Sequence, residues 1–487
     1  MKHCLYILLT ACLASLLIAC APRPTDVRPA DSPLSMYPDY ADITIPYNIA
    51  PLNFLLRDEA VDAVSVEVTG PAGSISQSAH GRKIIFPLKK WQSLLRQSRG
   101  DSLSVTVTAR SNGTWLRYPS FTWTVAQEPL DAYVSYRLIE PGYEVWNELQ
   151  ICERCTENFD ERILADNRQT DKSCMNCHVH GGNKGGLSMF HLRGAKGGTV
   201  LNRNGRLRKL TIQAEGLPSA AVYGDFHPSG RFGVFSTNVI IPAFHTERNL
   251  RLEVYDTKSD LAIADFDNNR MILSPLVTDS LSLETFPVFS ADGWWVYFCS
   301  APRVTLPDSI RQLRYSLCRI AFDASRGEWG NRVDTLWNAR LRGASVCHPK
   351  ASPDGRFLLY TVADYGTFPI WHRETDLQLM DLQTGETRNL AQANSNRSDT
   401  YHSWSSNSRW IAFASKRGDG QYGRVYFAYI DSAGVDHKAF VLPQSNPEKD
   451  DLSLKSYNIP DLSTEPVPFD AVDVENLYKN LSAEPFK

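Results

Sequence analysis

Apolar and polar residues alternate in short runs over most of the chain, the pattern of β-strands with one buried face. Between residues 41 and 130, the runs "VSVEVTGPAG", "SLSVTVTARSNG" and "SFTWTVA" are separated by Gly, Pro and Asn-Gly turns. Short strands with close turns over a stretch of this length predict a small, immunoglobulin-like β-sandwich. We therefore expect a mainly β fold in which this sandwich comes first.

A longer repeat begins near residue 187. Four segments align as a polar turn followed by a strand: "YGDFHPSGRFGVFST" (223–237), "FPVFSADGWWVYFCS" (286–300), "HPKASPDGRFLLYTV" (348–362) and "YHSWSSNSRWIAFAS" (401–415). The alignment superimposes one turn position, where a positive φ closes the turn; it holds Gly230, Gly293, Gly355 and Ser408. Three histidines fall in different columns, and we expect them at turns or rims: His227, His348 and His402.

This pattern resembles the Pro-Asp repeat of TolB-like β-propellers, also called PD40 or WD40-like repeats. The resemblance implies a circle of four-stranded blades over residues 187–447. At about 43 residues a blade, the chain predicts five to seven blades, with six as our expectation.

Two other segments lack this pattern. Residues 131–186 mix helix formers with few β-branched runs, which predicts short helices and loops. Residues 448–487 are polar and contain proline, so we expect an extended or partly disordered tail there.

The N-terminus predicts export. Residues 1–19 have a short positive start and an apolar run, as in a signal peptide, and that run is too short to span a membrane. The sequence Leu-Ile-Ala-Cys that ends at Cys20 resembles the lipobox of bacterial lipoproteins, which implies a lipid on Cys20; an ordinary secretory leader is the alternative. Residues 20–40 suit a flexible tether. We therefore expect a cell-envelope protein, attached to the membrane by lipid alone and facing the periplasm or the cell surface.

The charge and the catalytic motifs narrow the function further. The formal net charge of −3 is close to balance and predicts no nucleic-acid partner. Neither H-E-x-x-H nor G-x-S-x-G occurs, and no convincing nucleophile, acid or base stands out, so whether the chain is an enzyme is left open.

Four cysteines carry the most specific chemistry. Cys174, Cys177 and His178 form C-x-x-C-H, which attaches c-type haem through two thioethers and supplies an iron ligand. With Cys152 and Cys155 upstream, the same cysteines form C-x2-C-x18-C-x2-C, a spacing that suits a four-thiolate zinc site. Disulfides without a metal are a third interpretation.

Haem c is our prediction among these. A zinc site with four thiolates has no use for His178, and c-type haem is attached outside the cytoplasm. The glycines of residues 181–186 would let a flat macrocycle lie close to the backbone. The chain also resembles exported Bacteroidetes-type proteins that join C-x-x-C-H to a TolB-like propeller, which implies haem thioethers at Cys174 and Cys177 and a proximal ligand at His178.

The opposite face of the iron needs its own ligand or stays open. Among the residues after the glycines, we expect His191 as the distal ligand, with Met189 second. The first functional hypothesis is then a mono-haem envelope protein for electron transfer or sensing, with a redox or envelope partner. The second is a non-catalytic envelope interaction protein, in which the four cysteines are only structural.

Overall fold

The computed structural model describes residues 22–140, 147–244, 252–480 and 482–486. The chain folds as two compact units. Unit 1 contains Pro51–Ala126, Pro443–Glu448 and the described residues up to Asp42, and unit 2 contains Ile43–Ala50, Gln127–Leu442 and the described part of Lys449–Lys487. The signal peptide and Cys20 lie outside the described residues. In the part that is described, no helix is both long and apolar enough to cross a membrane.

The described residues of unit 1 form two sheets and one helix. The strands that unit 1 supplies to the larger sheet are β1 (Arg28–Pro29), β9 (Thr114–Arg117), β8 (Ser102–Ser111), β10 (Phe121–Ala126), β5 (Val61–Gly70) and β6 (Gly73–His80). The smaller sheet is formed by β2 (Met36–Tyr37), β4 (Phe54–Leu56) and β7 (Lys83–Ile84), and helix α2 spans Leu88–Gln97.

An aromatic core joins these elements. Trp91 of α2 and Trp123 of β10 are fully buried, and their ring centroids lie 5.4 Å apart, edge to face. Phe86 contacts both tryptophans as well as Phe54 of the smaller sheet. Alternate side chains of each strand are buried, so each sheet has one apolar face that packs into this core. This is the sandwich that the sequence pattern predicts.

Unit 2 is built from six sheets in chain order within the described residues. The first is β13 (Glu161–Asp166), β12 (Leu149–Cys155), β11 (Tyr133–Ile139) and β34 (Ser456–Ser463); the second is β14 (Met175–Gly181), β15 (Lys184–Leu192), β16 (Gly198–Arg203), β17 (Arg206–Thr211) and β35 (Glu484–Pro485). The third is β18 (Tyr223–Phe226), β19 (Phe232–Phe244), β20 (Leu252–Asp265) and β21 (Arg270–Ile272).

The fourth sheet is β22 (Ser282–Phe289), β23 (Trp295–Pro302), β24 (Ser316–Asp323) and β25 (Glu328–Trp337); the fifth is β26 (Ser345–Ala351), β27 (Phe357–Ala363), β28 (Asp376–Asp381) and β29 (Thr387–Asn389). The sixth is β30 (Asp399–Trp404), β31 (Trp410–Ser415), β32 (Arg424–Tyr429) and β33 (Phe440–Val441). Short elements complete the unit: β3 (Ile43–Pro46), η1 (Asn167–Gln169), η2 (Ile310–Gln312), α3 (Ala339–Arg342), η3 (Pro369–Trp371), α4 (Lys449–Leu452) and α5 (Ala471–Asn480).

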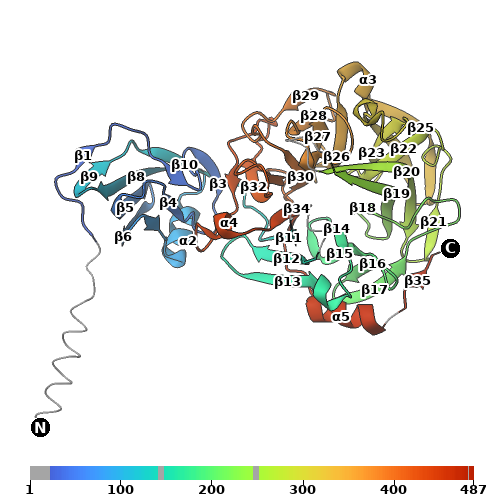
Figure 1. Cartoon of the computed structure of the whole chain (residues 1–487), viewed down its shortest axis with the longest axis horizontal. Coiled ribbons are helices and arrows are strands. Elements are labelled where there is room, and N and C mark those ends of the chain that lie inside the picture. Colours follow the sequence, from blue (N-terminus) through green and yellow to red (C-terminus); the bar gives the residue numbers. More distant parts are fainter. Residues whose placement is uncertain (1–21, 141–146, 245–251, 481, 487) are drawn as a thin grey trace, which may run out of the picture. The chain divides into compact units, whose positions relative to one another are not determined.

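The six sheets of unit 2 follow one another around a common axis (Figure 1). One strand of each sheet lies innermost, and these strands contact one another in the order β14, β18, β22, β26, β30 and β34; β34 also contacts β14. Strand β34 comes from the C-terminal part of the chain and pairs with β11 in the first sheet. This arrangement of four-stranded sheets is that of a β-propeller, as the repeat predicts.

Three expectations about secondary structure are wrong. Residues 20–40, expected to be a flexible tether, contribute β1 and β2 to the sheets of unit 1. Residues 131–186, expected to form helices and loops, instead form the first sheet and the start of the second. The predicted tail contributes β34, α5 and β35, so it is built into unit 2. Most strands of residues 131–186 pair with their neighbours in the chain, whereas β34 and β35 pair with the distant β11 and β17. In these segments the sheet context overrides the local propensity of the sequence.

The turn prediction is confirmed at all four aligned positions. Gly230, Gly293 and Gly355 have φ of 70°, 79° and 72°, and Ser408 has φ of 61°. Each residue closes the turn between an innermost strand and the next strand of its sheet.

Candidate functional site

The C-x-x-C-H segment forms β14, the innermost strand of the second sheet. Its pairing with β15 is interrupted between Asn176 and Val179, and Cys177 within this bulge has φ of 58°. Such bulges recur on four other innermost strands, each with one residue in the left-handed region: Phe286, His348, Tyr401 and Ile459. Cys177 therefore occupies a position that the repeat uses for backbone geometry.

Three of the bulged residues contact one another through their rings. With Tyr223, which begins the innermost strand of the third sheet, they form a chain of ring contacts: Tyr223–Phe286 at 4.5 Å, Phe286–His348 at 4.0 Å and His348–Tyr401 at 4.9 Å between centroids. The expectation that His348 lies at a turn or rim is wrong, because its ring is stacked in this cluster. Burial raises the pKa of the Cys177 thiol to about 11, so the thiol is a poor nucleophile at neutral pH.

His178 and the predicted distal ligand His191 point to opposite faces of the second sheet. His178 borders a small cavity with Ile151 and Leu164 of the first sheet. His191 instead packs edge-on against Phe235 of the third sheet, at 6.0 Å between centroids, and its Nδ1 lies 2.8 Å from Oγ1 of Thr199. One flat macrocycle therefore cannot lie between these two imidazoles.

The surroundings of His178 also leave no room for haem. The cavity beside it measures about 10 Å³, which is at the lower limit for one water molecule. Neither ring nitrogen makes a hydrogen bond of good geometry to a described residue, although the ring lies near the Ser135 backbone. Burial lowers the pKa of His178 to about 4, so the imidazole is neutral at pH 7.

The glycines after the motif have a different role from the one predicted. A Cβ on Gly185 would lie 2.4 Å from the carbonyl oxygen of Glu465, and one on Gly186 would lie 2.6 Å from Oδ1 of Asn204. Glycine is needed at these positions because the segment after β34 and the turn after β16 pass close to the backbone.

Cys152 and Cys155 do not act as a pair. They lie three residues apart on β12, in unbroken register opposite Tyr136 and Tyr133 of β11. Side chains alternate along a strand, so the two thiols point to opposite faces of the first sheet. This placement excludes both a local disulfide and joint coordination of zinc.

The predicted haem c, and zinc as its alternative, are therefore wrong. Among the described residues, no group of three or more His, Cys, Asp or Glu side chains could hold a metal ion. The described cysteines are all free: Cys152, Cys155, Cys174, Cys177, Cys299, Cys318 and Cys347. The electron-transfer hypothesis depended on that haem.

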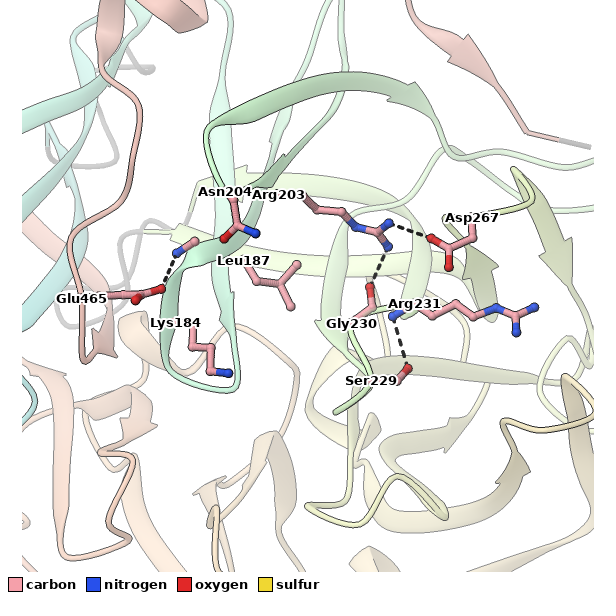
Figure 2. A pocket seen from close by; sticks show the side chains of 10 residues that line it. Lys184, Leu187, Arg203, Asn204, Ser229, Gly230, Arg231, Asp267 and Glu465 are labelled. Atoms are coloured by element: carbon pink, nitrogen blue, oxygen red, sulfur yellow. Dashed lines mark hydrogen bonds and ion pairs between the residues drawn. The ribbon is translucent and has the colours of Figure 1, made fainter.

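A surface pocket of about 340 Å³ lies where turns of the second and third sheets meet (Figure 2). Its walls come from the start of β15, the end of β16 with the β16–β17 turn, the β18–β19 and β20–β21 turns, and the segment after β34. The lining residues are Lys184, Gly186, Leu187, Arg203, Asn204, Ser229, Gly230, Arg231, Asp267 and Glu465. Turns positioned by a rigid sheet framework are common binding sites.

Two arginines of the pocket are held in place. Arg203 donates one hydrogen bond to Oδ1 of Asp267 at 2.7 Å and another to the Gly230 carbonyl at 2.8 Å (Figure 2). Arg231 donates to both carboxylate oxygens of Asp265, at 2.7 and 3.2 Å, and Asp265 is fully buried. Each guanidinium charge therefore has a carboxylate partner.

Ser229 also lines the pocket, and its hydroxyl lies 2.8 Å from Nδ1 of His227. The same turn in the other sheets contains an equivalent contact between residues two apart, from Ser290 to Asp292 and from Ser352 to Asp354. The Ser229–His227 contact is thus the local geometry of this turn, which places His227 in a turn as predicted.

Sequence reasoning missed a second buried histidine site. Nε2 of His372 lies 3.2 Å from Oε1 of Glu253, and its Nδ1 lies 3.3 Å from Oε1 of Glu374. Burial lowers the pKa of His372, but hydrogen bonds and charges of the two glutamates outweigh burial and raise it to about 9. Glu253 is on β20 and His372 follows η3, so only the fold brings them together.

No protein-family model matches the sequence, and no curated protein matches it. Partly similar solved structures include a puromycin-hydrolyzing peptidase of Mycobacterium tuberculosis (14% identity, TM-score 0.32), a DUF4784 family protein of Bacteroides caccae (10%, 0.29) and prolyl oligopeptidase B of Galerina marginata (11%, 0.36). The matches cover 56%, 73% and 81% of this chain, and 39%, 94% and 54% of those proteins. The chain thus spans about two fifths and about half of the two peptidases, and similarity at these TM-scores carries no conclusion about activity.

Proposed function

We propose that this chain is a non-catalytic binding protein of the bacterial cell envelope, anchored by a lipid on Cys20. In this proposal, unit 2 holds an envelope partner on the face that carries the pocket lined by Lys184, Arg203 and Glu465. The chemistry of the site is recognition, with no bond made or broken in the partner.

The observation that supports this proposal is the construction of the pocket. Five separate chain segments form its walls, and charged and amide side chains stand around Leu187 (Figure 2). The backbone beneath is held rigidly, since Glu465 accepts a hydrogen bond from the Gly186 N–H at 3.1 Å and Arg203 is fixed by two bonds. Polar groups held by a rigid framework around an apolar contact are typical of a ligand site.

Photo-crosslinking in cells tests this function. A photoreactive amino acid at Asn204, inside the pocket, should give an ultraviolet-dependent adduct with an envelope component. The same group at Leu341 of α3, whose side chain is 83% exposed, should give none and serves as the control. Lys184→Glu should abolish the adduct at position 204, and mass spectrometry should find the captured partner chemically intact.

Two results would contradict the proposal. One is an adduct that forms equally from positions 204 and 341 or that persists with Lys184→Glu, because it would not depend on the pocket. The other is a captured partner that has been cleaved or modified.

The lipid anchor has a separate test. Wild-type protein should incorporate labelled palmitate and sediment with membranes. Cys20→Ala should lose the label and appear in the soluble fraction, since the lipid is the membrane attachment in this proposal. Membrane association of Cys20→Ala equal to the wild type would exclude lipid anchoring at this residue.

A further inference from the structure

Some of the charged side chains that line the pocket have an ion-pair partner, and others do not. Arg203 is paired with Asp267, and Arg231 is paired with Asp265. Within the described residues, the Lys184 ammonium makes no ion pair, and neither does the Glu465 carboxylate. The pocket therefore presents one uncompensated positive and one uncompensated negative charge.

Glu465 is positioned for an external ligand. Its Oε1 accepts the Gly186 N–H, which fixes the carboxylate and leaves capacity for a second donor. Lys184 is the first residue of β15 and Glu465 follows β34, so the two charges come from different parts of the chain and border the same pocket.

We propose that this pocket binds a small zwitterion, namely a free amino acid or short peptide, with its ammonium on Glu465 and its carboxylate on Lys184. This inference rests on the proposed function in taking the pocket as the binding site, and it names the chemistry recognised there. A ligand with a single charge would engage only one of the two side chains, whereas a zwitterion can form a charge-assisted hydrogen bond with each.

The remaining lining residues suit the middle of such a ligand. Leu187 offers an apolar surface for a Cα atom or a small side chain, and the Asn204 amide and Ser229 hydroxyl can hydrogen-bond a peptide group (Figure 2). The paired Arg203 keeps spare N–H groups for the carboxylate, because only two of its donors are engaged in the bonds described. The volume of about 340 Å³ lies in the range of small-ligand pockets.

Calorimetry with the dipeptide Ala-Ala tests the proposal on the full chain. The comparison uses Ala-Ala, its N-acetyl form without the ammonium, and its C-terminal amide without the carboxylate. We expect wild-type protein to bind Ala-Ala roughly tenfold more tightly than either blocked form, the effect of losing one charge-assisted hydrogen bond.

Two variants assign each charge to its side chain. Lys184→Ala should bind Ala-Ala and its amide equally, while still discriminating against the N-acetyl form. Glu465→Gln keeps an oxygen for the Gly186 N–H and should lose only the preference for the free ammonium. Lys258→Ala and Glu386→Gln change exposed residues outside the pocket and should behave as wild type.

Two outcomes would overturn the proposal: equal binding of all three compounds to the wild type, or no saturable binding of Ala-Ala at millimolar concentration. The cross-linking result is independent of both. If cross-linking captures a pocket-dependent partner but calorimetry shows no preference for the zwitterion, the proposed function stands and only this inference fails. If the dipeptide binds but no partner is captured, the interaction role fails instead.

Discussion

His178 and His372 are both buried in unit 2, with 7% and 1% of their surface exposed, yet their environments are opposite. His178 belongs to a recognisable motif and makes no well-formed hydrogen bond, so burial lowers its pKa to about 4. His372 belongs to no motif and lies between two glutamates that raise its pKa to about 9. At neutral pH the first is uncharged and the second is a cation. A short motif specifies which side chains are present, but the residues around them in the fold set their pKa and their charge at neutral pH.

The largest effect is expected from removing the His372 cation. His372→Leu leaves Glu253 buried beside Glu374 without its counter-charge, which should lower the free energy of unfolding of unit 2 by about 3–5 kcal/mol. Urea denaturation at pH 7 measures it. Adding Glu253→Gln should recover part of the loss, and a double variant as unstable as the single one would show that charge pairing is not the cause.

The same site predicts a loss of stability at alkaline pH. The pKa of His372 is raised from 6.5 to about 9, so its contribution is complete below pH 6.5 and disappears as the pH rises through about 9. A shift of this size corresponds to about 3 kcal/mol. Urea denaturation at intervals from pH 6 to 9.5 should show this decline in the wild type, and a curve equally steep in His372→Leu with Glu253→Gln would refute the assignment.

A smaller effect is expected at Cys177, the neighbour of His178 in the motif. Its φ of 58° disfavours a β-branched side chain. Cys177→Val should therefore cost about 1–2 kcal/mol more than Cys177→Ala, as measured by denaturation under the same conditions. Equal stability of the two variants would mean that the bulge does not constrain this position.

Replacing His178 should change little at neutral pH. His178→Leu removes a neutral ring with no well-formed hydrogen bond, so the free energy of unfolding should stay within about 1 kcal/mol of the wild type at pH 7.5. Its lowered pKa makes the wild-type residue destabilising as the pH falls from 6.5 through about 4, because the unfolded chain takes up the proton first. His178→Leu should therefore lose less stability than the wild type between these values; an equal loss would contradict the lowered pKa.

The protein is expected to contain no covalently attached haem. Protein expressed with a haem-attachment system should show no Soret band and no haem retained on a denaturing gel. Covalent haem that depends on Cys174 and Cys177 would show that the motif is functional. It would also contradict the description of His178 as a buried, neutral side chain without a role in binding.

The sequence by itself determined the local features of this protein. Alternation of apolar residues identified the sandwich of unit 1, and the aligned turns identified the repeated sheets, because strand burial and positive φ depend on residues close in the chain. Ser408 stands where the other three turns have glycine, and its φ of 61° is positive as the aligned turn sequence predicts.

Only the tertiary structure decided what the polar residues do. The first sheet depends on β34, more than 300 residues after β11, and local propensity could not predict that pairing. The approach of Glu465 to the start of β15 and of Glu253 to His372 has the same origin. Charge, burial and hydrogen bonding are set by residues adjacent in space. The same C-x-x-C-H sequence can therefore bind haem in one fold and form the inner strand of a propeller in this one.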